Sequence, residues 1–282
     1  MVFDPELTDR VTAVVQHVIA SLVLPSFRTL RPEDIHRKDT PGDPDDLVTI
    51  VDQTAERLLV DGLRDIVPGA AFIGEEAVAG NPALLAALSS AAPIWLIDPI
   101  DGTKNFARGD ADFGVMLALV QDGATRASWM VVPAAEPALA VVARQGCGTL
   151  VNGSRVNMTR QAGLRPRGTV HTRMMPAESA RAVVDALHGR YDQQPSTGAA
   201  ATEYSAILRG EKDFAIYYRL LPWDHAPGAL ALTEAGGAAV HLGGEPYRPL
   251  SPHQVTIFAA SVELGGTIRD WLTRGQHVPV SR

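Results

Sequence analysis

The first apolar stripe along the chain has the spacing of an α-helix. Val11 and Val15 are followed by further aliphatic residues three or four positions apart, which predicts one buried helical face. Asp4 is placed to cap this helix, Pro5 suits its first turn, and Pro25 is expected to end it. The chain is therefore expected to open with a long amphipathic helix.

A polar segment separates this helix from a second one. Residues 31–48 are rich in Pro and Asp, which predicts a loop or a mobile arm. Ala55, Leu59 and Leu63 then line one face of the second predicted helix, and Pro68 stops it. Two helices joined by a polar arm are thus expected before the first strand.

From residue 70 onward the pattern changes to short apolar runs with turn residues between them, and helical spacing returns later. This alternation predicts an α/β fold with layered sheets and helices. We expect an N-terminal half, residues 1–152, tightly joined to a C-terminal half, residues 153–282. The predicted strands are 71–74, 94–97, 113–120, 127–132, 139–142, 214–216, 238–241 and 256–259, and the later helices are 176–189, 199–209, 225–235 and 262–273.

Composition narrows the class of protein. The 282 residues have a formal net charge of −7 and no Lys/Arg cluster, so we expect neither a nucleic-acid nor a membrane partner. Cys147 is the single cysteine, which excludes an internal disulfide and fits a reducing cytoplasm. The acidic N-terminus does not have the pattern of a signal peptide. A cytoplasmic globular protein is the expectation.

The acidic residues are unevenly distributed. Residues 1–122 hold 20 acidic and 9 basic side chains, whereas the remaining 160 residues hold 12 acidic and 16 basic ones. A solvated acidic surface is the ordinary explanation, and we expect it for Asp43, Asp45 and Asp46 in the polar segment. A cation site is the alternative for the acids that follow apolar runs.

The segment 95–106 carries the strongest chemical signal. An apolar strand runs directly into Asp98, and Pro99 turns the chain so that Asp98 and Asp101 can face one point. Two carboxylates this close repel each other unless a cation lies between them, and Mg²⁺ prefers such oxygens together with backbone carbonyls such as that of Ile100. If a helix begins at Gly102 and Thr103, its free N–H groups can hold a phosphate beside the metal.

Three further acidic positions also stand at the ends of apolar runs. Glu75 and Glu76 follow a strand, Asp224 precedes a helix, and Asp52 lies where an apolar run enters a helix. Alone, the glutamates fit a surface turn and each aspartate fits a helix cap. A shared site accounts for all of them together.

The motifs resemble those of the inositol monophosphatase family of magnesium-dependent phosphatases. The resemblance rests on Gly74-Glu-Glu, on Asp98-Pro-Ile-Asp-Gly-Thr and on Trp223-Asp…Gly228…Glu234-Ala-Gly-Gly, in this order and at these separations. It implies an αβαβα sandwich, commonly a homodimer, that hydrolyses a small phosphomonoester with two or three Mg²⁺.

The resemblance also implies roles for individual residues. Asp52 and Thr103 would orient and deprotonate the attacking water, and Glu76 would be an outer acid. Gly102 and Thr103 would contact the substrate, as would the backbone around Gly198 and Ala199 and the side chain of Tyr217. The implied metal ligands are Glu75, Asp98, the Ile100 carbonyl, Asp101 and Asp224.

Three positions depart from the pattern of the members that act on inositol phosphates. Tyr217 stands where those members usually have a glutamate that binds sugar hydroxyls, which puts inositol phosphate in doubt. Lys104 and Arg108 also differ, and Lys104 is reminiscent of relatives acting on histidinol phosphate or 3′-phosphoadenosine 5′-phosphate. Those activities stay open, as does a non-enzymatic binding or regulatory module, because fold alone does not fix function.

Overall fold

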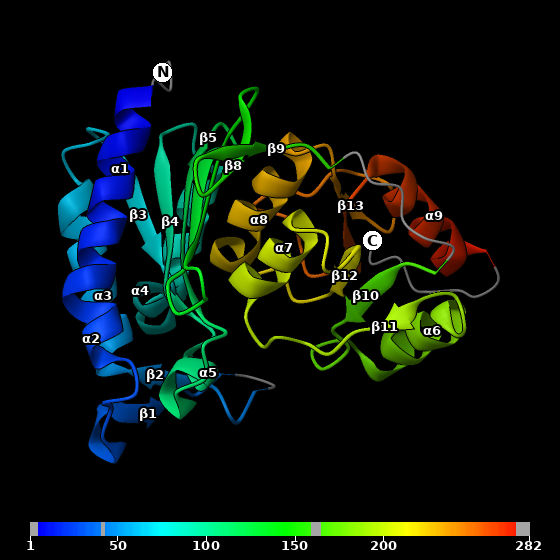
Figure 1. Ribbon diagram of the computed structural model, residues 1–282, viewed down its shortest axis with the longest axis horizontal. Coiled ribbons are helices and arrows are strands. Elements are labelled where there is room, and N and C mark those ends of the chain that lie inside the picture. The colour runs from blue at the N-terminus through cyan, green and yellow to red at the C-terminus, as the bar shows by residue number, and fades with distance from the viewer. Residues whose placement is uncertain (1–4, 41–42, 159–164, 275–282) are drawn as a thin grey trace.

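The computed structural model describes residues 5–40, 43–158 and 165–274, which form two β-sheets, a small hairpin and the helices around them (Figure 1). The strands are β1 (Ile35–Arg37), β2 (Leu47–Thr49), β3 (Ala71–Gly74), β4 (Ile94–Asp101), β5 (Gly114–Gln121), β6 (Ala124–Val132), β7 (Leu139–Arg144), β8 (Gly148–Val151), β9 (Ser154–Val156), β10 (Arg167–Val170), β11 (Asp192–Gln193), β12 (Phe214–Tyr217), β13 (Ala238–His241) and β14 (Thr256–Ala259). The α-helices are α1 (Pro5–Val18), α2 (Leu24–Ser26), α3 (Ile50–Leu63), α4 (Glu75–Gly80), α5 (Thr103–Arg108), α6 (Ala177–Leu187), α7 (Ala200–Leu208), α8 (Pro222–Glu234) and α9 (Val262–Thr273).

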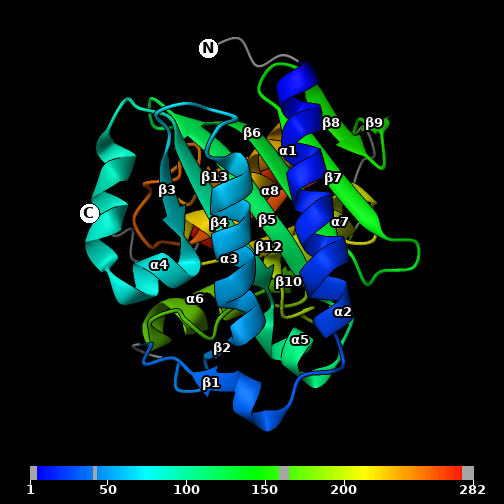
Figure 2. The same ribbon diagram turned by 90° about the vertical axis from the view of Figure 1, so that its left-hand side faces the viewer.

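The two sheets differ in size and direction. The large one has the order β3-β4-β5-β6-β7-β8-β9, parallel only between β3 and β4. The small one has the order β11-β10-β12-β14-β13 and is mixed. The helices complete five layers: α1 and α3 cover the outer face of the large sheet, α7 and α8 lie between the sheets, and α6 and α9 cover the far face (Figures 1 and 2). The predicted αβαβα sandwich is confirmed.

Successive side chains of the central strands point to opposite faces of the large sheet and pack into two separate hydrophobic cores. Trp95 and Ile97 of β4 pack with α1 and α3, whereas Ile94 and Leu96 pack toward α7 and α8. A strand covered on both faces has few polar positions, which explains why β4 and β5 read as continuous apolar runs. An acidic residue at the end of such an apolar run, such as Asp98 in β4, therefore marks the point where the strand leaves the hydrophobic core.

The first part of the chain differs from the prediction in two ways. Residues 31–48 are not simply a loop, because β1 pairs antiparallel with β2, with Ile35 opposite Thr49. The first helix also does not end at Pro25: a π-helical turn, Ile19–Val23, leads into α2, which ends at Ser26. The helical run that includes α1 and α2 therefore ends at Ser26, one residue after the predicted end at Pro25. Asp4 is outside the described residues.

The helical run Glu6–Ser26 is long and apolar enough to qualify as a membrane span, with a mean hydropathy of 1.3. The sequence patterns above do not single it out. A core helix passes the same test of length and composition, and Val11, Val15 and Val18 are at most 1% exposed in the core shared with α3 and the large sheet. Its valines thus form part of the core.

Candidate active site

β4 ends in two carboxylates that line one cavity. Asp98 is 1% and Asp101 7% exposed. Residues three positions apart face opposite sides of a regular strand, but the pairing with β5 shifts between these two residues. Asp98 lies opposite Met116 and Asp101 opposite Gly114, so two residues of β4 oppose one of β5. This bulge, which includes Pro99, lets both carboxylates face the same side.

Gly102 joins β4 to α5 in the left-handed conformation, with φ of 84°. A Cβ at this position would lie 2.7 Å from the Cβ of Ala199 and 3.0 Å from the carbonyl oxygen of Asp112. A side chain is therefore excluded, and the start of α7 lies directly against this turn. α5 begins at Thr103, as the motif predicts.

Asp52 combines a capping position with a contact to Thr103. It is the third residue of α3, and one carboxylate oxygen accepts hydrogen bonds from the backbone N–H (2.8 Å) and the hydroxyl (2.5 Å) of Thr49. Its other oxygen lies 2.9 Å from the Thr103 hydroxyl, which is also 3.0 Å from the carbonyl of Ile100. Burial raises the pKa of Asp52 to about 6. Asp52 is thus a buried acceptor for the Thr103 proton.

Glu75 and Glu76 begin α4 and share one cation. The ammonium of Lys38 lies 2.7 Å from Glu75 and 2.6 Å from Glu76. Glu56 accepts the backbone N–H groups of Glu76 and Ala77, which fixes the first turn of this short helix. Burial raises the pKa of Glu76 to about 8. Within the described residues Glu75 lines the cavity, and Glu76 lies behind it against Lys38.

Asp224 lies in the first turn of α8. The helix begins at Pro222, three residues earlier than predicted, and Leu221 occupies the cap position, so Asp224 is not the cap. The neighbouring His225 is buried and faces away, with its ring nitrogens 2.7 Å from the hydroxyl of Tyr204 and 2.9 Å from the carbonyl of Arg219. His225 therefore supports the start of α8.

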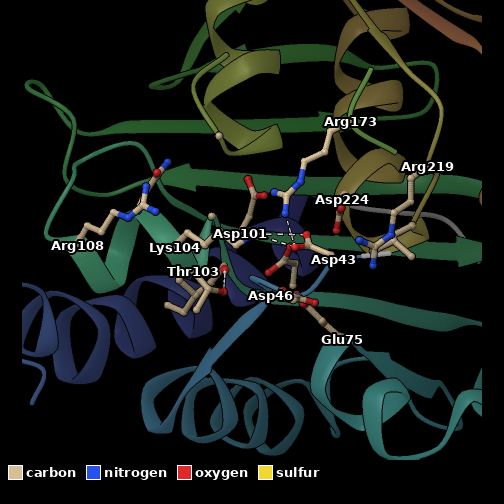
Figure 3. Close-up of a pocket in the computed structure, with 16 residues that line it drawn as sticks. Asp43, Asp46, Glu75, Asp101, Thr103, Lys104, Arg108, Arg173, Arg219 and Asp224 are labelled. Atoms are coloured by element: carbon tan, nitrogen blue, oxygen red, sulfur yellow. Dashed lines mark hydrogen bonds and ion pairs between the residues drawn. The ribbon is translucent and has the colours of Figure 1, made fainter. Parts of the chain in front are cut away.

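These elements surround a cavity of about 340 Å³ (Figure 3). A second cavity of about 480 Å³ adjoins it and shares Asp101, Gly198 and Asp224 with it. Ala199 and Tyr217, both predicted substrate contacts, line the second cavity. The first cavity is lined by Asp43, Asp46, Glu75, Asp98, Ile100, Asp101, Gly102, Thr103, Lys104, Asn105, Arg108, Arg173, Gly198, Arg219, Leu221 and Asp224.

The carboxylates around this cavity fit a divalent metal. One oxygen of Asp98 is buried without a hydrogen-bond partner in the described part of the chain. Burial, Glu75 and Asp101 raise the pKa of Asp98 well above its usual range, and burial, Glu75 and Asp101 do the same for Asp224. Among residues 5–40, 43–158 and 165–274, no group of three His, Cys, Asp or Glu side chains already has coordination geometry, and Glu75 is paired with Lys38. A metal would relieve this repulsion and engage the free oxygen.

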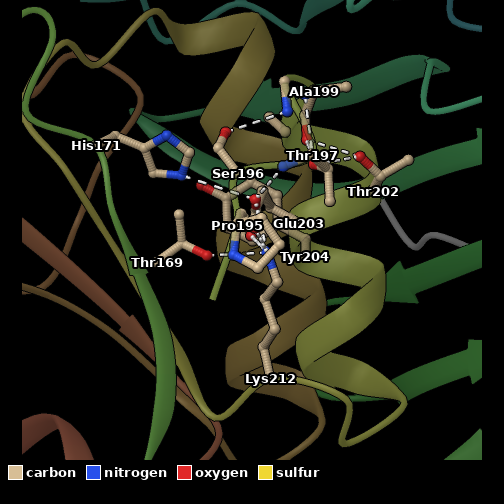
Figure 4. Close-up of polar contacts among 12 residues, drawn as sticks. Thr169, His171, Pro195, Ser196, Thr197, Ala199, Thr202, Glu203, Tyr204 and Lys212 are labelled. Carbon is tan, nitrogen blue, oxygen red and sulfur yellow. Dashed lines mark hydrogen bonds and ion pairs between the residues drawn. The ribbon is translucent and has the colours of Figure 1, made fainter. Parts of the chain in front are cut away.

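The start of α7 fixes Asp101. The two oxygens of its carboxylate accept the backbone N–H groups of Ala200 (3.0 Å) and Ala201 (2.6 Å). Behind this turn Glu203, which is 0% exposed, accepts the N–H of Thr197 and pairs with the buried ammonium of Lys212 at 2.7 Å (Figure 4). The same ammonium also lies 2.7 Å from the carbonyl oxygen of Pro195 and 2.9 Å from the hydroxyl of Thr169. The buried pair therefore holds the segment that forms one wall of the site.

Lys212→Met is expected to lower the free energy of unfolding by about 3–5 kcal/mol, because it leaves the Glu203 charge buried and unpaired. The double variant Lys212→Met/Glu203→Gln removes that charge and should recover part of the loss. Urea unfolding followed by circular dichroism measures both. Arg64→Met, which breaks the exposed pair with Asp61, is the control. Equal losses for Lys212→Met and Arg64→Met would contradict the buried-charge argument.

The sequence and the fold were also compared with those of known proteins. A model of the inositol monophosphatase family matches residues 6–274. The chain belongs to that family. The fructose-1,6-bisphosphatase/inositol-1-monophosphatase of Thermotoga maritima is 29% identical over 206 residues, 73% of this chain and 75% of the relative. The Nus factor SuhB of Xylella fastidiosa is 30% identical over 199 residues, 68% of each chain. A solved Thermotoga maritima IMPase has a TM-score of 0.77 at 23% identity, with 95% of this chain and 97% of that chain covered.

Family membership fixes the reaction class. Inositol monophosphatases are metal-dependent hydrolases of phosphate monoesters, and this inositol monophosphatase family member is accordingly a phosphoric monoester hydrolase. The motifs used to recognise the family supply four of the carboxylates, the Thr103 hydroxyl and the Gly102 turn of one cavity.

Sequence reasoning missed several residues of this inositol monophosphatase cavity. Asp43, expected on a solvated surface, is 8% exposed and pairs with Lys104 (3.1 Å) and Arg173 (2.5 Å). Arg219 lines both cavities but belongs to none of the motifs. Its position between a predicted strand and Asp224 was the only signal that could have found it.

Proposed function

We propose that this protein hydrolyses a small phosphomonoester with two or three Mg²⁺, bound by Glu75, Asp98, the Ile100 carbonyl, Asp101 and Asp224. The carrying observation is the convergence of four carboxylates from β4, α4 and α8 on one cavity, with one buried Asp98 oxygen lacking a hydrogen-bond partner in the described residues. Carboxylate and carbonyl oxygens are the ligands that Mg²⁺ prefers. When bound, Mg²⁺ would neutralise these groups and polarise both the attacking water and the phosphoester.

In this proposal Thr103 and Asp52 position the attacking water. The Thr103 hydroxyl, at the cavity wall, donates to the buried carboxylate of Asp52 and presents its own oxygen as an acceptor for a proton of the water. Thr49 holds the other oxygen of Asp52, so this acceptor keeps one orientation. Glu76, paired with Lys38, would hold Glu75 in place from behind.

The proposed substrate contacts line the two adjoining cavities. Gly102 and Thr103 would offer backbone N–H groups to the phosphate, and Gly198 and Ala199 would approach the substrate with their backbone. Tyr217 would contact the alcohol part of the ester. A neutral phenol cannot replace a carboxylate as the acceptor for two sugar hydroxyls, which disfavours an inositol phosphate.

The substrate candidates form a short panel: inositol 1-phosphate, histidinol phosphate, adenosine 3′,5′-bisphosphate and fructose 1,6-bisphosphate, the last suggested by the name of the Thermotoga relative. We expect phosphate release from at least one of them with Mg²⁺ and loss of that release in EDTA. Restoration by excess Mg²⁺ is the control. No Mg²⁺-dependent release from any phosphomonoester would instead favour the binding-module alternative.

Three finer predictions accompany this function. We propose a homodimer in the cytoplasm that binds neither nucleic acid nor membrane, on the basis of the family resemblance and the sequence composition. The Xylella relative carries the name Nus factor, so the absence of a nucleic-acid partner deserves a direct binding test. Sedimentation of the protein alone would test the homodimer, and sedimentation with a structured RNA would test whether the protein binds nucleic acid.

A further inference from the structure

Arg219 stands out among the cations around the site. Three of the other cations near the carboxylates are paired: Lys38 with Glu75, and both Lys104 and Arg173 with Asp43. Arg108 also has no partner among the described residues, but it lines only the first of the two cavities. Arg219 is half-buried and lines both cavities, yet within the described residues its guanidinium makes no ion pair or hydrogen bond. A cation in this position is available to a ligand.

The position of Arg219 is fixed by its own backbone. Its carbonyl oxygen lies 2.9 Å from Nε2 of the buried His225, and the next N–H, that of Leu220, donates to Nδ1 of His253 at 3.0 Å. The side chain therefore starts from a held segment between β12 and α8. In Figure 3 Arg219 lies beside Asp224, whereas Arg108 lies at the opposite end of the cavity. Arg219, two residues after the end of β12, therefore places a positive charge at the wall of both cavities.

The wall next to Arg219 is neutral and aromatic. The ring of Tyr217 stacks on His171 with centroids 4.1 Å apart and an angle of 9°. Burial raises the pKa of Tyr217 well above its usual range and lowers that of His171 to about 4, so both are uncharged at neutral pH. A carboxylate at position 217 would repel an anion, whereas this wall together with Arg219 accepts one.

We propose, building on the proposed function, that the alcohol part of the substrate carries a second phosphate and that Arg219 binds it. Guanidinium groups bind phosphate through two parallel charge-assisted hydrogen bonds, so one arginine on a held backbone suffices for recognition. The two adjoining cavities, about 340 and 480 Å³, have the size of a site for a nucleotide or a sugar bisphosphate. Arg219 is then a specificity-determining residue, not a member of the hydrolytic machinery.

Matched substrate pairs test this assignment. Adenosine 3′,5′-bisphosphate is compared with adenosine 3′-phosphate, and fructose 1,6-bisphosphate with fructose 1-phosphate, all with saturating Mg²⁺. We expect the two-phosphate member of one pair to have a kcat/KM at least about 10-fold higher, mainly through a lower KM. The pair that shows the preference identifies a nucleoside or a sugar as the carrier of the second phosphate.

Substitution of Arg219 provides the second arm. Arg219→Met should reduce kcat/KM for the preferred two-phosphate substrate at least about 10-fold more than for its one-phosphate partner, and Arg219→Lys should keep part of the preference. Arg108→Met is the control and should affect both members of the pair equally. Equal kcat/KM within each pair, or an equal loss in Arg219→Met, would overturn the assignment while leaving the proposed function intact. Absence of Mg²⁺-dependent release from all four compounds would overturn the assignment of Arg219, and the proposed function would fall with it only if inositol 1-phosphate and histidinol phosphate also released no phosphate.

Discussion

Asp98→Asn is expected to lower kcat by about 1,000-fold while the protein stays folded. The substitution keeps the size of the side chain and removes the negative charge that a cation in the cavity requires. Metal stabilisation of transition-state charge is worth several kcal/mol, and each 1.4 kcal/mol corresponds to about a factor of ten in rate. Phosphate release at saturating substrate and Mg²⁺, with circular dichroism to verify folding, measures the effect.

The same substitution is expected to stabilise the metal-free protein at neutral and higher pH. Burial, Glu75 and Asp101 raise the pKa of Asp98, and burial raises that of Asp101 from 3.8 to about 7. Carboxyl groups that titrate at higher pH in the folded than in the unfolded chain bind protons more tightly when folded. The free energy of unfolding therefore falls as the pH rises from about 4 through these raised values. Asparagine carries no charge, so this fall should be shallower in the variant.

Thermal unfolding in EDTA between pH 5 and pH 8 tests this second expectation. Mg²⁺ should raise the Tm of the native protein more at pH 8 than at pH 5, and should raise that of Asp98→Asn less. Asp185→Asn, which removes an exposed carboxylate on α6, is the matched control and should leave both the activity and the pH dependence of Tm close to those of the native protein. Near-normal Mg²⁺-dependent activity in Asp98→Asn would refute the assignment of Asp98 as a metal ligand.

The part of the site that could be predicted from sequence is the part encoded locally. Asp98, Asp101, Gly102 and Thr103 lie within six residues, so an apolar strand, a proline and a glycine turn determine how they sit relative to each other. The layered α/β fold class followed from the alternation of short apolar runs with helical spacing, and the αβαβα order was implied by the family resemblance. Asp224 was found because it belongs to the Trp223-Asp motif at the start of a predicted helix, although that helix begins two residues before it and not after it.

The residues that sequence reasoning missed depend on contacts between distant segments. Arg173 pairs with Asp43 from 130 positions away, and this pairing exists only because the β1–β2 hairpin lies beside the C-terminal half. The hairpin itself was interpreted as a loop, since β1 is three residues long and largely exposed and therefore has no apolar periodicity. Lys212 and Glu203 are buried charges, which polar patterning assigns to the surface unless the partner is known.

Thr103→Val is expected to reduce kcat by about 100- to 10,000-fold, the range associated with positioned acid–base groups. The substitution keeps the shape of the side chain and removes the hydroxyl that lies 2.9 Å from Asp52. Asp52→Asn should cause a loss of similar size. Because the two groups act as one unit, the double variant should be little worse than either single variant, rather than showing the product of the two losses.

The pH profile and a capping control separate this role from a structural one. Burial raises the pKa of Asp52 to about 6, so kcat/KM of the native enzyme should rise with pH through this region, and Asp52→Asn should lose that rise. Thr49→Ala removes the cap of α3 and should cost about 0.5–2 kcal/mol of stability while retaining the contact between Asp52 and Thr103. A loss of turnover in Thr49→Ala as large as that in Thr103→Val would contradict the direct role of the Thr103 hydroxyl, because Thr49→Ala removes only one of the two hydrogen bonds by which Thr49 orients Asp52 and leaves the contact with Thr103 in place.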